Sequence, residues 1–192
     1  NASLYRTRAE GTYFFVFDPG TSTQNLGNLG KVIYKGADID LAAQITEGLD
    51  GHVGLGITDS EIKASARAAS DIGNEAPLVS EYTLNVGARY RRPLGFWPGV
   101  EAFVRTDYQL IGPTFFYPDN FTVRDPVHLV DLRFGLDGKA WTVTGWSKNL
   151  NDEDYNAEWS PGPLFFPNPG YTNNFVFKGQ PRVVGVDVVY RF

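Results

Sequence analysis

The closing stretch RVVGVDVVYRF, residues 182–192, indicates the fold of the whole chain. Polar or small residues, Gly185, Asp187 and Arg191, alternate there with apolar ones. The apolar side chains occupy every second position: Val184, Val186, Val188, Tyr190 and Phe192. A period of two is typical of a β-strand with two chemically different faces. Because chain ends fray unless something holds them, we expect this strand to be paired within a sheet.

Composition excludes several classes of function. The 192 residues contain no cysteine, which removes disulfide scaffolds, thiolate metal sites and cysteine nucleophiles. The net charge is -5 and the basic residues are scattered, so a nucleic-acid partner is not expected. No run of about 18 apolar residues predicts a spanning helix. The 14 Phe, 10 Tyr and 21 Gly favour an all-β chain. Methionine is absent even at position 1, so we expect a piece of a longer polypeptide.

Seven further segments show the same alternation, and with the closing stretch they predict eight strands. The alternation is clearest in SEYTLNVGARYR, where Tyr82, Leu84 and Val86 share one side. It is weakest in the first segment, RAEGTYFFVFD. The seven segments are residues 8–18, 36–46, 51–59, 80–91, 100–112, 128–138 and 139–150.

The connections between these strands alternate in length. The short ones comprise residues 47–51, 92–99 and 136–139, and the long ones residues 18–31, 60–77, 112–126 and 149–181. In an up-and-down meander this alternation means that the two ends of the sheet face unlike environments. Bacterial membrane barrels have short periplasmic turns and long outer loops. The sequence therefore predicts an antiparallel, up-and-down transmembrane β-barrel whose apolar side contacts outer-membrane lipid.

A soluble sandwich is the alternative, because two packed sheets would produce the same alternation. The polar sides of the strands favour the barrel, since charged residues there would line a wet lumen. Three arginines among them would contact a solute or would pair with lumen carboxylates. The residues predicted to face the lumen are Glu81, Arg89, Arg105, Asp107, Asp131 and Arg133, with Asp187 on the last strand.

WSKNLNDEDYN, residues 146–156, resembles a stretch that follows the penultimate strand in TonB-dependent outer-membrane receptors. Residues 34–61 are similar to that family's Gly-x-Glu strand, small turn and following strand, although Asp38 replaces the usual Glu. The terminal Phe192 resembles the sorting signal that the outer-membrane assembly machinery recognises. The likeness covers nearly the whole chain.

The resemblance implies both an architecture and a function. Transporter barrels of this class have about 22 strands and a plugged lumen. Residues 1–192 would then be the carboxyl-terminal part of the barrel domain, and the plug domain, the TonB box and the earlier strands would lie outside this sequence. The implied function is active, TonB-driven uptake of a scarce nutrient. Iron chelates, cobalamin, oligosaccharides and plant-derived aromatics all remain possible ligands, and no cofactor is implied.

A second hypothesis is a small autonomous outer-membrane barrel, acting as a passive pore or as an enzyme at the barrel rim. A rim enzyme would need a clustered nucleophile and base. The sequence shows no such arrangement, so an enzyme is not expected.

Aromatic residues in the predicted outer loops are the candidate ligand-binding residues. Such rings could stack on a sugar or a planar chelate, or they could pack the loops together. The candidates are Phe115, Phe116, Tyr117, Trp159, Phe165, Phe166 and Tyr171. The acidic run Asp152 to Asp154 could hold a hard cation or form a solvated turn. His52 and His128 are isolated in sequence, so no metal site is predicted.

Overall fold

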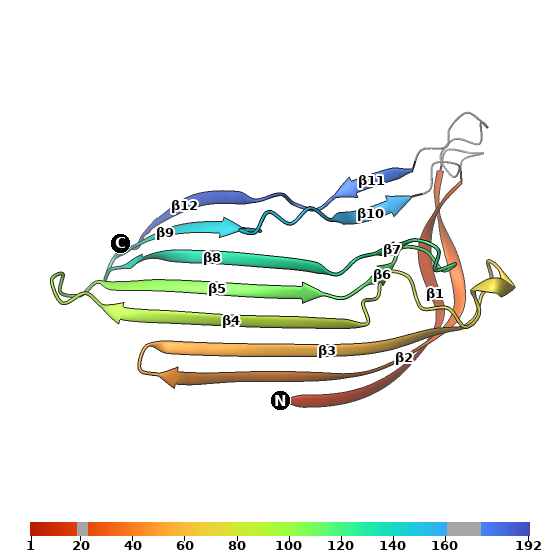
Figure 1. Ribbon diagram of the computed structural model, residues 1–192, viewed down its shortest axis with the longest axis horizontal. Helices are drawn as coiled ribbons and strands as arrows, with labels where there is room; N and C mark the ends of the chain where they lie inside the picture. Colours follow the sequence, from red (N-terminus) through yellow and green to blue (C-terminus); the bar gives the residue numbers. More distant parts are fainter. Residues whose placement is uncertain (19–22, 161–173) are drawn as a thin grey trace.

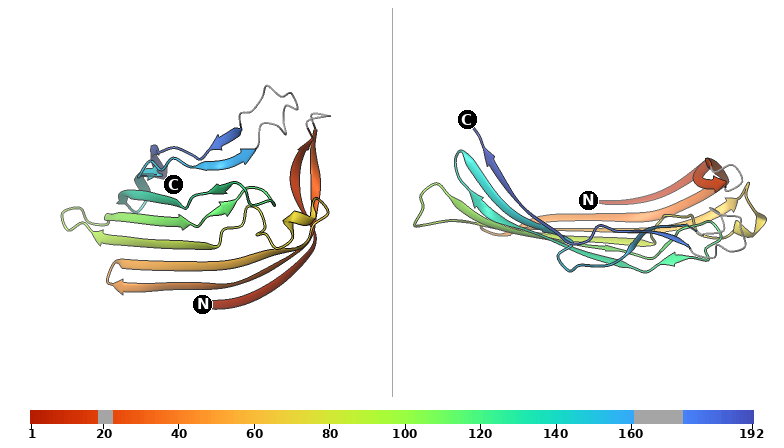
Figure 2. Two further views of the ribbon diagram at one scale, coloured as in Figure 1. Left: turned by 45° about the vertical axis from the view of Figure 1, so that its right-hand side comes forward. Right: turned by 90° about the horizontal axis from the view of Figure 1, so that it is seen from above.

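The computed structural model describes residues 1–18, 23–160 and 174–192. Eight antiparallel strands form one sheet, and each pairs with its neighbours along the chain (Figure 1). This confirms the predicted all-β meander, and Figure 2 shows that the sheet is curved rather than flat. The strands are β1 (Ala2–Asp18), β2 (Thr23–Thr46), β3 (Leu49–Ala64), β4 (Tyr82–Pro93), β5 (Glu101–Ile111), β8 (Val127–Asp137), β9 (Trp141–Lys148) and β12 (Val183–Tyr190).

The two ends of the sheet differ as expected. At one end, the short-turn end, β2 joins β3 through Glu47 and Gly48, whose φ of 81° suits glycine. The other end, the long-loop end, carries small elements that the sequence did not predict. They are the 3-10 turn η1 (Ala69–Asp71) and the strands β6 (Thr114–Phe115), β7 (Val123–Arg124), β10 (Asn156–Ser160) and β11 (Phe175–Lys178).

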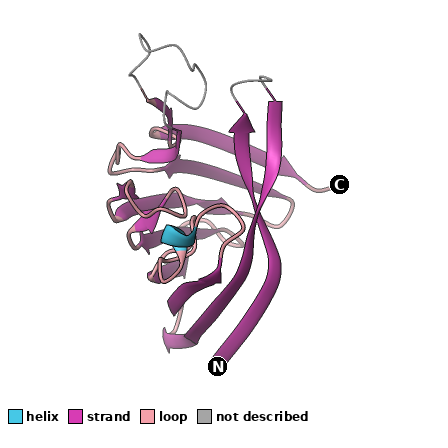
Figure 3. Cartoon of the chain, turned by 90° about the vertical axis from the view of Figure 1, so that its right-hand side faces the viewer, coloured by secondary structure: helices cyan, strands magenta, loops and turns pink. Residues whose placement is uncertain are grey.

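The prediction of a long loop over residues 18–31 is wrong for most of that segment. There β2 begins at Thr23 and pairs with β1 in a two-stranded ribbon that extends past β3. Figure 3 shows the two strands twisted about each other along this extension. The ribbon begins at a register shift beside Gly11 and Gly30, with φ of 70° and 78°. Both angles favour glycine, so this Gly-rich segment forms a bulge and a hairpin where its composition indicated a loop.

Register places most of the apolar residues of the strands on one face of the sheet, here called the apolar face. One cross-strand row contains Leu41, Val53, Val86, Tyr108 and Val130. Many of these side chains are open to their surroundings; Leu41, for example, is 62% exposed. On β3 the apolar positions run from Leu49 to Ile57, close to the 9 to 11 residues with which a strand crosses a bilayer.

No second sheet covers the apolar face in the part of the chain that the structure describes, because the only other sheets there are two-stranded. The side chains of Val184, Val186 and Val188 are each 71% exposed. A soluble sandwich would bury such residues against a facing sheet. The arrangement therefore favours the membrane barrel.

The buried apolar core lies at the long-loop end. Leu29 and Val32 of β2, Ile62 of β3 and Ala76 of the following loop are buried there. Phe14, Tyr34 and Val79 pack around them. The core thus fixes the base of the β1–β2 ribbon to the loop after β3. Within residues 1–18, 23–160 and 174–192, no helix is long and apolar enough to cross a membrane.

Candidate functional site

The face opposite the apolar one, here called the polar face, collects the predicted lumen residues. Asp50, Arg89, Arg105 and Arg133 lie in one cross-strand row. The next row holds His52, Gly87, Asp107 and Asp131. Glu81 lies directly before β4, where its carbonyl oxygen accepts a hydrogen bond from the Thr58 amide at 2.8 Å. The strand periodicity therefore placed these residues on a common face, and that they line a lumen stays a prediction.

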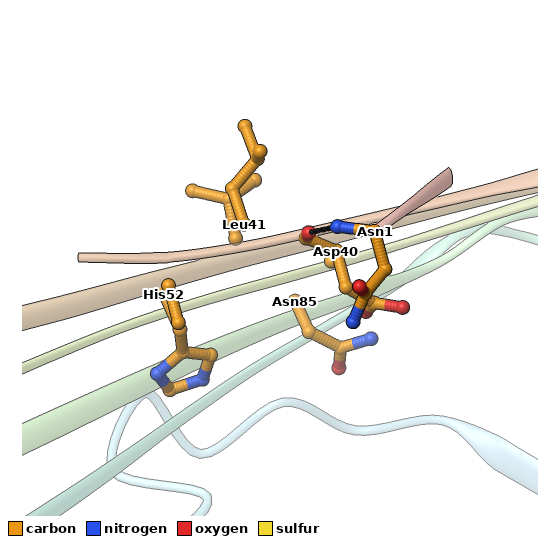
Figure 4. A pocket seen from close by; sticks show the side chains of 8 residues that line it. Asn1, Asp40, Leu41, His52 and Asn85 are labelled. Carbon is orange, nitrogen blue, oxygen red and sulfur yellow. Dashed lines mark hydrogen bonds between the residues drawn. The ribbon is translucent and has the colours of Figure 1, made fainter.

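Figure 4 shows the two faces at one place on the sheet. Leu41 projects to one side, whereas His52 and Asn85 project to the other. These residues, with Asp40 and Asn1, line an open cavity of about 430 Å³ at the β1 edge. The amino group of Asn1 donates a hydrogen bond to the Asp40 carbonyl oxygen at 2.7 Å. A second cavity of about 210 Å³ follows on the polar face, where His52, Asp107 and Asp131 contribute to its wall.

Among the three arginines of the row, only Arg105 has a carboxylate partner in the described part of the chain. Its Nε and Nη2 donate to the two carboxylate oxygens of Asp107 at 2.7 and 2.8 Å. The guanidinium carbon of Arg89 lies 6.0 Å from the ring centroid of Phe103, a cation–π contact. Arg133 is exposed and has no ion pair among the described residues. The row therefore carries an excess of positive charge.

The other nearby carboxylates have partners of their own. Asp131 Oδ1 accepts a hydrogen bond from the Asn149 amide at 3.0 Å. Asp50 lies 3.5 Å from Arg91, and Asp107 also lies 3.8 Å from His52 Nε2. We call the eight-stranded sheet the wall. Pairing with carboxylates of the wall, one of the expected roles of the arginines, therefore accounts for Arg105 but not for Arg89 or Arg133.

Aromatic rings on the polar face lie over glycines of the neighbouring strand. Tyr5 crosses Gly36, and its hydroxyl group lies 2.7 Å from Thr58 Oγ1. Trp146 lies over Gly185 of β12 in the same way. A Cβ atom at either glycine would collide with the ring, so only glycine permits this close approach.

At the long-loop end, residues 65–81, 112–126 and 149–160 form a unit that we call the loop assembly. Asn120 joins its first two segments: its Oδ1 accepts from the Glu75 amide at 2.8 Å, and its Nδ2 donates to the Glu75 carbonyl oxygen at 3.1 Å. Asn74 Nδ2 donates to the Pro118 carbonyl oxygen at 2.9 Å. The φ of Asn120 is 56°, a left-handed conformation that asparagine tolerates better than most residues.

Three of the candidate ligand-binding aromatics pack against one another within the loop assembly. Trp159 lies 6.4 Å from Phe116 and 5.8 Å from Tyr117, centroid to centroid. Phe116 is only 8% exposed, so its ring contributes to loop packing. Phe115 lies beside it on β6. Contact of these rings with a ligand stays a prediction, and Phe165, Phe166 and Tyr171 lie outside the described residues.

Two charged residues of the loop assembly were not predicted from the sequence. Asp71 is fully buried and accepts hydrogen bonds from Ser65 Oγ at 2.8 Å and Arg67 Nε at 2.9 Å. Arg124 donates from Nη2 to Thr114 Oγ1 at 3.1 Å. Burial lowers the pKa of Arg124, against an opposing effect of Tyr155. Neither residue belongs to a periodic pattern, so no signal in the sequence set them apart from ordinary loop charges.

The stretch that carried the family resemblance has a clear structural role. Asn149 is 4% exposed, with a φ of 49°. Its Nδ2 donates to the carbonyl oxygens of Glu153 and Gln180, both at 3.0 Å, and its Oδ1 accepts from the Glu153 amide at 2.9 Å. Asn149 therefore holds the turn after β9 to the segment that enters β12.

The acidic run takes part in the same turn. The Arg182 amide donates to Asp152 Oδ1 at 3.2 Å, and Lys178 Nζ donates to Asp154 Oδ1 at 2.8 Å. Across the described residues, no group of three or more acidic or histidine side chains is arranged to hold a metal ion. His128 lies on the apolar face, where its Nδ1 is 2.8 Å from the Tyr108 hydroxyl group.

Comparison with solved structures supports the barrel architecture. The chain superposes on the ferric yersiniabactin uptake receptor FyuA from Yersinia pestis with a TM-score of 0.78, 17% identity, and coverage of 100% of this chain and 27% of that one. For the siderophore receptor PiuA from Acinetobacter baumannii the TM-score is 0.69 and the identity 17%, with coverage of 98% of this chain and 25% of that one. For the copper transporter OprC the TM-score is 0.71 and the identity 14%, with coverage of 100% of this chain and 28% of that one. At such identities the likeness shows the fold alone, and this chain spans about a quarter of each structure.

A family model provides the assignment. The model of the TonB-dependent receptor-like β-barrel matches residues 1–150. That match confirms the resemblance seen in the sequence and the location in the bacterial outer membrane, and the matched family is one of transporters rather than enzymes. The match, the alternating faces and the superposed barrels agree: the chain belongs to the TonB-dependent receptor family and forms part of the receptor β-barrel.

Proposed function

We propose that this chain is the carboxyl-terminal part of the barrel of a TonB-dependent receptor that actively takes up a scarce nutrient. The observation that carries the proposal is the division of one eight-stranded sheet into an exposed apolar face and a charged polar face. Lipid would contact the apolar face, and the polar face would line the lumen. The long-loop end would then face outward and receive the nutrient.

The proposed partners follow from this arrangement. Earlier barrel strands would pair with β1, a plug domain would fill the lumen, and the TonB complex would move the plug with energy from the inner membrane. The assembly machinery would recognise β12 together with the exposed Phe192 that follows it. The cargo would be a small molecule or an oligosaccharide. Similarity to a ferric yersiniabactin receptor, a siderophore receptor and a copper transporter makes a metal chelate the first class to test.

The aromatic loop residues are the proposed cargo contacts. Tyr117 and Trp159 are half-buried within the loop assembly, and a ligand above the lumen would contact them there. Phe116 would support them from beneath. Stacking of a planar chelate or a sugar on such rings would supply affinity with little loss of side-chain entropy.

A growth experiment that measures TonB-dependent uptake tests the proposal. The receptor that contains this chain would be deleted, and growth under metal limitation would be followed with candidate chelates as the sole metal source. We expect loss of growth on at least one chelate, restored by the receptor gene but not in a strain that lacks TonB. Equal growth of the deletion strain on every candidate would count against uptake of metal chelates.

A closed eight-stranded barrel is less well supported. Within the described residues β1 pairs only with β2, and β12 pairs only with β9, so the two edges of the sheet do not meet. An autonomous pore would need to pair these edges, because an open edge in lipid leaves backbone groups without hydrogen bonds.

A further inference from the structure

The arginine row of the polar face carries a charge arrangement that the wall does not neutralise. Arg89, Arg105 and Arg133 occupy directly opposed positions on β4, β5 and β8. Adjacent strands lie about 4.8 Å apart, so the outer two arginines start about 10 Å apart on the backbone. Like charges directly opposite each other destabilise a sheet. A row of this kind is therefore expected to have an anionic partner.

Carboxylates of the wall supply only part of that charge. Asp107 binds Arg105 in a two-pronged contact, and Asp50 lies 3.5 Å from Arg91. Asp131 accepts a hydrogen bond from the Asn149 amide and forms no ion pair with Arg133 among the described residues. Arg89 has the ring of Phe103 as its neighbour, and Arg133 has no ion pair among the described residues. The guanidinium groups of Arg89 and Arg133 therefore lie on either side of the neutralised Arg105. Both are open to the space beside the polar face.

The occupant best suited to this row is a resident one. A solute in transit would leave the arginines opposed for most of the time, whereas a bound polypeptide would neutralise them continuously. Eight strands are about a third of a 22-stranded barrel. The chain nevertheless covers only 27% of the length of the yersiniabactin receptor, so that receptor contains polypeptide beyond its barrel wall. Carboxylate side chains suit this row, because guanidinium groups bind them through paired hydrogen bonds.

We propose that Arg89 and Arg133, on either side of Arg105, bind carboxylate side chains of the domain that fills the lumen and hold that domain against this part of the wall. The inference rests on the proposed function, which supplies the plug domain as occupant. Removing water from unpaired guanidinium groups would be costly, so the plug must present acidic residues where it covers the row.

The test uses the complete receptor, purified in detergent, with both arginines replaced by glutamine: Arg89→Gln with Arg133→Gln. Hydrogen–deuterium exchange is measured across the plug. We expect at least tenfold faster exchange in the plug segment that faces the row, and the same segment should respond to molar salt in the unmodified receptor. The matched control is Arg92→Gln, because Arg92 lies on the same strand, is exposed and belongs to the opposite face. It should leave plug exchange unchanged.

Unchanged plug exchange in a folded double variant would overturn the inference. Reduced uptake of an anionic chelate, with plug exchange unchanged, would also overturn it and would assign the row to the solute. If the double variant fails to fold, Arg133→Gln alone decides, because Arg133 makes no ion pair within the described wall. TonB-dependent uptake by the unmodified receptor is measured in parallel: its absence would refute the proposed function, whereas normal uptake with unchanged exchange refutes only the arginine contact.

Discussion

The wall and the loop assembly are stabilised in opposite ways. In the wall, Val186 is 71% exposed, and no described part of the chain forms a layer over the large side chains of the apolar face. In the loop assembly, Asp71 is fully buried and Phe116 is 8% exposed. The wall depends on the surrounding lipid to cover its apolar face, whereas the loop assembly depends on its own packing and hydrogen bonds. Substitutions in the two regions should therefore act through different forces.

The largest effect is expected from a charge placed on the apolar face. Val53→Arg lies midway along the apolar segment of β3, and a charge near the bilayer midplane costs roughly 2–4 kcal/mol. Asn85→Arg is the control, because Asn85 is exposed on the polar face. Unfolding of the receptor barrel in lipid vesicles measures both free energies. Equal costs for the two variants would contradict the assignment of lipid to the apolar face.

The second effect concerns Asn149, where the wall meets the loop assembly. Asn149→Ala leaves the carbonyl oxygens of Glu153 and Gln180 without their donor, which we expect to cost about 1–3 kcal/mol of unfolding free energy. Asn149→Gly also removes the side chain but accommodates the φ of 49°. Chemical unfolding of both variants separates the lost hydrogen bonds from backbone strain. Full stability of the glycine variant would show that the hydrogen bonds contribute nothing.

Asn120 tests the loop assembly alone. Asn120→Ala removes two hydrogen bonds to Glu75, and we expect a loss of roughly 1 kcal/mol of local stability. Amide exchange should rise in residues 65–81 and 112–126 while the strands of the wall keep their protection. Asp119→Ala is the control, because Asp119 accepts only a local hydrogen bond from Phe121. Loss of protection throughout the wall would mean that the two regions are not independent.

The smallest effect is a dependence on pH in the loop assembly. Burial, followed by the charges of Glu81 and Asp59, raises the pKa of Glu75 above its ordinary value of 4.5. The folded loop therefore holds its proton more tightly than the unfolded chain, so stability falls as the pH rises from that value through the raised pKa. Glu75→Gln should remove this decrease and raise stability at neutral pH. Amide exchange of residues 72–80 over a pH series measures it, and an unchanged slope in the variant would refute the assignment.

The same contrast explains what the sequence predicted. The strands of the wall were predictable because lipid and lumen impose a period of two, as in Tyr82, Leu84 and Val86 of β4. The alternating connections then indicated the barrel. The ribbon over residues 23–31 was missed because its glycines and asparagines are common to loops and to bulged hairpins.

Side-chain placement in the loop assembly was not predictable. Asn120 contacts Glu75 across 45 positions of sequence, and no local pattern encodes such a pair. The arginine row was predicted only as a set of residues on one side. That Arg105 would bind Asp107, and that Arg133 would have no ion pair in the described wall, depends on rotamers and on register between strands.

The aromatic rings that lie over glycines have an evolutionary consequence. Because Tyr5 needs Gly36 beneath it, and Trp146 needs Gly185, neither member of a pair can change freely. A larger residue at the glycine would force the ring away from the sheet, into the space beside the polar face. At Gly185 the Trp146 ring is the only obstacle among the nearest atoms, so related receptors should replace positions 146 and 185 together. Joint variation at these two positions would then trace how a lineage adjusted the space beside the polar face.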